Sequence, residues 1–115
     1  MKTFNQFINE GVRDLMKPKS EEDILKTLDG LSTYEKLMKG CKYNIVLAVE
    51  QAIKEDEDII HIDDEWPLRN AIGNKSFDVV KFLLDNGADV HALDDDAFYR
   101  AADDKKMLKL LKQYD

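Results

Sequence analysis

Few residues of this 115-residue chain could do chemistry, and the first to consider are its two histidines and its single cysteine. His61 and His91 lie 30 residues apart, each near acidic residues, and such a set could in principle bind a metal ion. If the intervening residues form one pair of packed helices, the two side chains are on the order of 10 Å apart. Bonds from a metal to its ligands are only about 2 Å long, so a shared metal ion is not expected.

Cys41 is predicted to be a buried packing residue, because a nucleophilic cysteine needs a neighbouring base and neither histidine is expected near it. The acidic stretch at residues 54–58 lacks the ordered ligands and the glycine of a calcium-binding loop. The sequence also holds no glycine-rich phosphate loop, no nucleophile elbow and no zinc motif. We therefore expect no catalytic residues, no metal and no cofactor, and a protein that is not an enzyme.

The overall charge narrows the range of partners. The chain has 24 acidic and 17 basic residues, a formal net charge of −7, and an acidic surface repels phosphate backbones. Direct nucleic-acid binding is therefore not expected. Basic protein partners and mimicry of nucleic acid both remain compatible with the acidity, which solubility alone also explains.

The number of cysteines and the hydropathy of the sequence indicate the compartment in which the protein is expected to function. A lone cysteine cannot form a disulfide framework within the chain, which favours a reducing compartment. No apolar run approaches the roughly 18 residues of a membrane span, and the N-terminus lacks the continuous apolar core of a secretory signal. We expect a protein, monomeric and without a membrane partner, that acts inside a cell or a particle.

From residue 31 onward the sequence repeats with a step of 30 residues. The positions in register are apolar (Met38, Leu68, Phe98), small (Cys41, Ala71, Ala101), apolar again (Val49 with Val79, Ile53 with Leu83) and finally Ile60-His61 with Val90-His91. A fixed period in this range predicts a solenoid of helical pairs, in which stacked neighbours bury a continuous apolar stripe.

Each unit is predicted to contain two short helices and a connecting loop. Apolar periodicity places these helices at residues 33–40, 43–54, 66–73, 76–85, 96–102 and 104–113. Their inner positions are predicted to be Leu37, Leu47, Leu68, Val80, Leu84, Leu108 and Leu111.

The region before the repeats is predicted to be helical as well. A helix is expected over residues 21–28, capped by Ser20 with Asp23 and ended by Asp29-Gly30. Before a break at Pro18, the apolar residues among the first 15 share one helical face. We divide the chain into an N-terminal helical segment and cap, residues 1–30, and a repeat region, residues 31–115.

The middle unit resembles an ankyrin repeat, whose pattern is T-P-L-H-x-A, a second helix ending in L-L, and G-A-D-x-N-A. This chain reads Trp66-Pro67-Leu68-Arg69-Asn70-Ala71, and later Leu83-Leu84-Asp85-Asn86-Gly87-Ala88-Asp89-Val90-His91-Ala92. Pro67 suits the first turn of a helix, and Gly87 suits the left-handed residue that ends one. The resemblance implies an all-α, ankyrin-type helical solenoid of about three short repeats with an N-terminal helical cap, and a function in binding another protein.

The unit also departs from the ankyrin pattern. Trp66 and Arg69 replace the family's Thr and His, so the hydrogen bond between those two residues is absent. The step of 30 residues is shorter than the family's 33, and the missing residues fall in the loop that normally forms a projecting β-turn, called a finger. The resemblance therefore implies short fingers with acidic tips at residues 63–65 and 94–96. His61 and His91 occupy a position that is usually Asn in the family, where the side chain hydrogen-bonds the loop backbone.

Ankyrin modules usually bind through the finger tips and the exposed side of each first helix. Trp66 is the residue we expect to matter most, the alternative being a Trp packed at the helix start. The predicted partner-binding residues are Tyr34, Asp63, Asp64, Glu65, Trp66, Arg69, Asn70, Asp94, Asp95, Asp96, Tyr99 and Arg100, and Glu35, Lys39 and Gly73 lie on the same side.

The first ten residues, Met1-Lys2-Thr3-Phe4-Asn5-Gln6-Phe7-Ile8-Asn9-Glu10, resemble the capsid-targeting leader of internal head proteins in T-even-type bacteriophages. In that family the prohead protease cuts after the Glu of an I-x-E motif. The resemblance implies cleavage after Glu10 and a new N-terminus at Gly11. The alternative is that this segment is an amphipathic helix that caps the solenoid.

Taken together, the residues and the two resemblances give three hypotheses. The first is a phage-encoded module that binds a host or phage protein, in the host cytoplasm during infection or packaged in the phage head. The second is a structural internal head protein. The third is an acidic nucleic-acid mimic that inhibits a DNA-binding protein.

Overall fold

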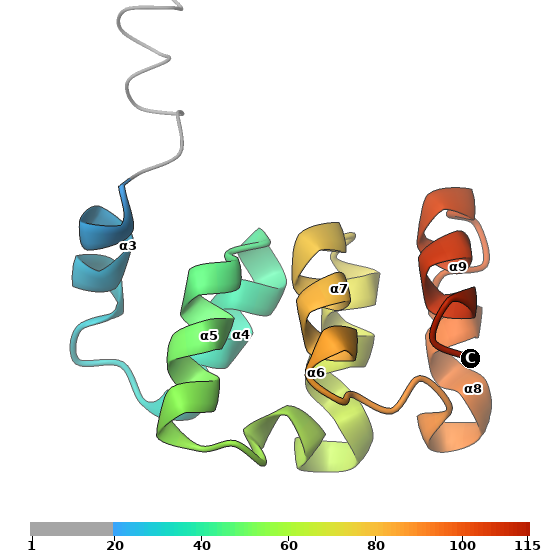
Figure 1. Ribbon diagram of the computed structural model, residues 1–115, viewed down its shortest axis with the longest axis horizontal. Coiled ribbons are helices and arrows are strands. Elements are labelled where there is room, and N and C mark those ends of the chain that lie inside the picture. Colours follow the sequence, from blue (N-terminus) through green and yellow to red (C-terminus); the bar gives the residue numbers. More distant parts are fainter. Residues whose placement is uncertain (1–19) are drawn as a thin grey trace, which may run out of the picture.

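The structure, a computed structural model, describes residues 20–115, and all regular secondary structure in this part of the chain is helical (Figure 1). The elements are α3 (Glu21–Leu28), α4 (Thr33–Tyr43), α5 (Val46–Glu55), the short 3₁₀ helix η2 (Ile59–His61), α6 (Ile62–Gly73), α7 (Phe77–Asp85), α8 (Ala92–Arg100) and α9 (Lys105–Lys112). The predictions made for residues 1–19, including the leader and the break at Pro18, lie outside the described residues.

The helices form three consecutive pairs, α4 with α5, α6 with α7, and α8 with α9. Figure 1 shows them side by side in a row, with the second helix of each pair in front of the first. Helix α6 contacts both α4 and α8, so the first helices form one continuous layer, and α3 packs on α5 at the N-terminal end. This is the predicted all-α, ankyrin-type solenoid with a helical cap. None of the helices between residues 20 and 115 has the length and hydropathy needed to cross a membrane.

The small residues in register lie where neighbouring units approach each other. Cys41, Ala71 and Ala101 are all buried, as the repeat predicted, and belong to one core cluster that extends through all three pairs. Burial raises the pKa of the Cys41 thiol to about 12, because the thiolate would lose its hydration. The side chain therefore stays a neutral thiol at physiological pH, as expected of a packing residue.

Several predicted helix ends are confirmed and others are wrong. Helix α3 has the predicted bounds, and the Ser20 side chain accepts the Asp23 backbone N–H at 3.2 Å. The helix predicted from residue 43 begins only at Val46, because the left-handed Asn44 ends α4 first. Leu47 was expected to face the core but is half-buried, and instead lines an apolar cavity of about 550 Å³ beside α3.

Polar contacts that the sequence analysis did not anticipate tie the first pair to the second. The Asn44 side chain donates to the Asp78 carboxylate at 3.1 Å and accepts the backbone N–H of Val79 at 3.0 Å. The buried Ser76 hydroxyl donates to the backbone carbonyl of Cys41 at 2.5 Å. Stacking of neighbouring units is therefore specified by hydrogen bonds as well as by apolar packing.

Candidate functional site

The predicted fingers at the starts of α6 and α8 are left-handed turns. Asp63, Asp64 and Glu65 have φ values of 51°, 55° and 64°, and at the equivalent place in the next unit residues 93–95 have φ values of 53°, 54° and 66°. Consecutive left-handed residues other than glycine cost roughly 1–2 kcal/mol each, so such turns persist only where other contacts hold them. The fingers are therefore short, as predicted, but their shape was not foreseen.

Each left-handed turn is closed by a histidine and a carboxylate four residues later. The Nδ1 of His61 contacts Oε1 of Glu65, and the Nδ1 of His91 lies 2.6 Å from Oδ1 of Asp95. The prediction that these histidine side chains hydrogen-bond the loop backbone is therefore wrong, because their ring nitrogens meet carboxylates. The spacing His-x-x-x-acid, present twice at the repeat step, is the sequence signal that could have revealed these pairs.

Glu65 does not form part of an exposed acidic tip. It is 7% exposed, and its Oε2 atom has no hydrogen-bond partner among the described residues. Its burial follows from the left-handed turn, which directs its side chain back toward His61 instead of outward. The exposed acids of this finger are Asp63 and Asp64 alone.

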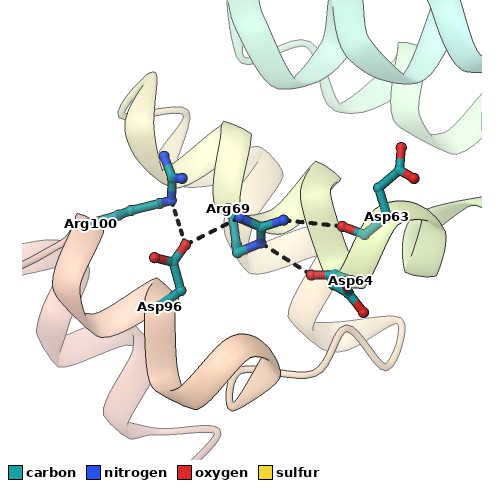
Figure 2. Close-up of polar contacts among 5 residues, drawn as sticks. All are labelled: Asp63, Asp64, Arg69, Asp96 and Arg100. Carbon is teal, nitrogen blue, oxygen red and sulfur yellow. Dashed lines mark hydrogen bonds and ion pairs between the residues drawn. The ribbon is translucent and has the colours of Figure 1, made fainter.

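Arg69 braces the first turn from within α6, as Figure 2 shows. Its Nη2 donates to the backbone carbonyl of Asp63 and its Nε to that of Asp64, both at 3.1 Å. Its Nη1 reaches Oδ2 of Asp96, on the next unit, at 3.4 Å. The Arg69 side chain is only 12% exposed, because most of its polar atoms are engaged within the protein. Its contact with a partner stays a prediction.

Asp96 lies at the centre of this network rather than at a tip. Arg100 donates from Nε to Oδ2 of Asp96 at 2.6 Å, and Arg69 contacts the same oxygen from the preceding unit (Figure 2). The hydrogen bond from Arg100 lowers the pKa of Asp96 and outweighs the opposing effect of burial, and Arg69 makes a smaller contribution in the same direction as Arg100. The predicted tip at residues 94–96 therefore ends one residue too late, because the left-handed turn comprises residues 93–95 and Asp96 lies one repeat step after Trp66.

Trp66 is half-buried and lies close to two guanidinium groups. The Cζ of Arg69 lies 5.2 Å from its ring and the Cζ of Arg100 lies 5.5 Å away, both within the range of cation–π attraction. Asp96 holds both arginines and so fixes what surrounds the indole. We call Trp66, Arg69, Asp96 and Arg100 the Trp66 cluster.

The other predicted binding residues differ in exposure. Tyr99 is 75% exposed and Tyr34 is also exposed, whereas Asn70 is half-buried and accepts a hydrogen bond from Asn74 at 2.5 Å. The acids that remain open to solvent on the two fingers are Asp63, Asp64, Asp94 and Asp95.

Among residues 20–115 there is no group of three His, Cys, Asp or Glu residues placed to hold a metal ion. His91 contacts two carboxylates, since its Nε2 also lies 2.8 Å from Asp115. The hydrogen bond to Asp95 raises the pKa of His91, and the charges of Asp95, Asp115 and Asp89 act in the same direction. This arrangement favours a protonated imidazole that stabilises the turn.

The paired helices, the small residues between them and the short fingers define an all-helical solenoid of the ankyrin type. Residues 63–92, which run from the first left-handed turn into the start of α8, match the family model described as Ankyrin repeat. Neither the comparison with curated proteins nor the comparison with solved structures gave a match. The repeat that matches is the one that contains Trp66 and Arg69, and modules of this class are typically non-enzymatic and mediate protein–protein interaction.

Proposed function

We propose that this chain is a non-enzymatic module that binds a protein partner through the Trp66 cluster and the exposed Tyr99 beside it. The observation that carries the proposal is the contact of the Trp66 ring with both Arg69 and Arg100, which come from two successive units and share Asp96. Trp, Tyr and Arg supply most of the energy at protein interfaces. Because these side chains are already held in place, binding them costs less conformational entropy than ordering free ones would.

The charge around the cluster favours a partner with basic groups. Asp63, Asp64, Asp94 and Asp95 expose their carboxylates on the fingers at either side of it. Such a rim speeds the encounter with a positively charged partner and discriminates against acidic ones, more than it adds to affinity. Association should therefore slow as salt screens these charges.

The test begins with co-purification of a stoichiometric partner, followed by titration with variants of the chain. Trp66→Ala should weaken binding by about 30-fold or more, as expected for a central aromatic residue of an interface. Tyr43→Ala is the matched control, since Tyr43 is also exposed but is the last residue of α4, in the preceding helical pair. Equal effects of the two changes, or no partner at all, would count against the proposal.

The resemblance of residues 1–10 to a phage leader supports a more specific version of this function. In it the chain is phage-encoded and binds a host or phage protein during infection, in the host cytoplasm or after delivery from the phage head. Mass spectrometry of purified virions tests the location: a chain starting at Gly11 supports packaging. A chain found only in infected cells and starting at Met1 would argue against packaging and against the structural head-protein alternative.

A further inference from the structure

The second-helix layer carries a surface unlike the rest of the molecule, in the groove between α7 and α9. Figure 1 shows these two helices in front of α6 and α8, the helices that carry the Trp66 cluster. The groove holds a depression of about 210 Å³, smaller than the 300–1,000 Å³ typical of small-molecule sites. Its lining residues are Phe77, Lys81, Lys106, Lys109, Leu110 and Gln113.

The three lysines of the groove stand out against an acidic background. Residues 20–115 hold 22 acidic and 13 basic residues, yet both walls of this groove present ammonium groups. None of the ion pairs formed among these residues includes Lys81, Lys106 or Lys109, whereas Lys26, Lys36 and Lys54 are all paired. The lysine that lies closest to an aromatic ring is Lys106, with its Nζ 4.2 Å from the ring centroid of Phe77.

Helix stability does not explain this arrangement. Lys105 and Lys106 occupy the first turn of α9, where the helix dipole favours acidic residues, and α3 and α4 do begin with acids. Asp104 caps α9 through the backbone N–H of Met107, which offsets part of this cost. Lys109 lies four residues after Lys105 and three after Lys106, so the like charges also repel along one face. Departures from local stability rules are expected where a surface has a binding role.

We propose that the groove between α7 and α9 binds an acidic peptide segment of a partner protein. Its carboxylates would meet Lys81, Lys106 and Lys109, and one apolar side chain would rest on Phe77 and Leu110. The pairing would remove the repulsion among the lysines. A nucleic acid fits less well, because a long polyanion would extend beyond this groove over a chain that carries 24 acidic and 17 basic residues. The proposal does not depend on the Trp66 cluster.

The probe for the test is a fluorescent peptide of Asp and Glu with one central Leu, titrated with the full chain at low salt and followed by anisotropy. The double change Lys106→Glu with Lys109→Glu should weaken binding by about tenfold or more, as loss of two charge pairs predicts. The matched control is Lys26→Glu with Lys54→Glu, which alters the net charge equally at exposed sites away from the groove. It should change binding by less than about twofold. Circular dichroism verifies that both variants fold.

Four results would overturn the proposal. One is no binding by the unaltered chain, and another is equal weakening by the two double variants, which would mean that only the net charge matters. The third is tighter binding of a single-stranded oligonucleotide than of the peptide, which would make the occupant a nucleic acid. Trp66→Ala should leave peptide binding unchanged. Loss of peptide binding in that variant would mean that the peptide binds at the Trp66 cluster, and would refute the proposed binding at the groove.

Discussion

The two left-handed turns have nearly the same backbone and the same histidine–carboxylate pair, yet different surroundings. At the first turn, Arg69 donates to two backbone carbonyls and Glu65 is buried. At the second, the position equivalent to Arg69 is Tyr99, which is exposed, and His91 reaches Asp115 instead. The comparison indicates that such a turn forms without an arginine at this position, and that Arg69 additionally links the first turn to Asp96 of the next unit.

The largest effect should come from removing that brace. Arg69→Ala should lower the free energy of unfolding by about 2 kcal/mol, because two carbonyls and Asp96 lose a donor at a nearly buried position. Tyr99→Ala, at the equivalent position of the second turn, should cost less than about 0.5 kcal/mol. Urea denaturation measures both. Equal losses would show that the two turns are supported alike.

The histidines provide a second comparison. His61→Ala should destabilise the protein by about 1–2 kcal/mol, because it leaves the buried Glu65 carboxylate without its partner. His91→Ala should cost less, since Asp95 and Asp115 are exposed and can be hydrated. The same denaturation experiment tests the order of the two. A greater loss at His91 would contradict the burial-based argument.

The residues that open the two turns should respond differently to glycine. Leu93 has a φ of 53° and is 52% exposed, so Leu93→Gly relieves left-handed strain and should raise stability by up to about 1 kcal/mol. Asp63→Gly should gain less, because Asp tolerates this conformation better than Leu does. Thermal unfolding of the two variants ranks the gains, and a loss at residue 93 would mean that the Leu side chain stabilises the turn.

The smallest expected effect is a pH dependence specific to the second turn. Because the pKa of His91 is raised in the folded protein, its contribution is fully present below the unfolded value near 6.5. The contribution is lost as the pH rises through the folded pKa. The stability difference between the unaltered chain and His91→Ala should therefore be larger at pH 6 than well above the folded pKa. A stability difference that does not change with pH would show that the positive charge of His91 does not stabilise the turn.

The helical pairs could be predicted from the sequence because apolar and small residues recur at the same positions of each unit, and each such position adds to the evidence for the repeat. Cys41, Ala71 and Ala101 recur at one step and are buried together, and Gly87, with a φ of 95°, follows α7 as its position implied. The tip predicted at residues 94–96 included Asp96, but the left-handed turn comprises residues 93–95, since a run of acids does not mark where a turn ends. Asp96 lies one repeat step after Trp66 and contacts both Arg69 and Arg100.

The left-handed turns could not be predicted from propensity. Runs of three such residues without glycine are intrinsically unfavourable, so their formation depends on contacts made after the units stack. Arg69 illustrates this dependence, because the hydrogen bonds through which it stabilises the protein go to backbone carbonyls of the turn, and an isolated helix has no such turn. The sequence correctly marked Arg69 and Trp66 as unusual for the repeat, but could not show that one supports the other.

Asp96 belongs to the last helical pair, whereas Trp66 and Arg69 belong to the pair before it. Local opening of this pair would withdraw Asp96 and Arg100 from the indole. A ligand that requires the complete cluster would bind only the closed form and would stabilise it by mass action. Amide hydrogen exchange in α8 and α9 would then slow as ligand is added, making the end of the chain a reporter of occupancy.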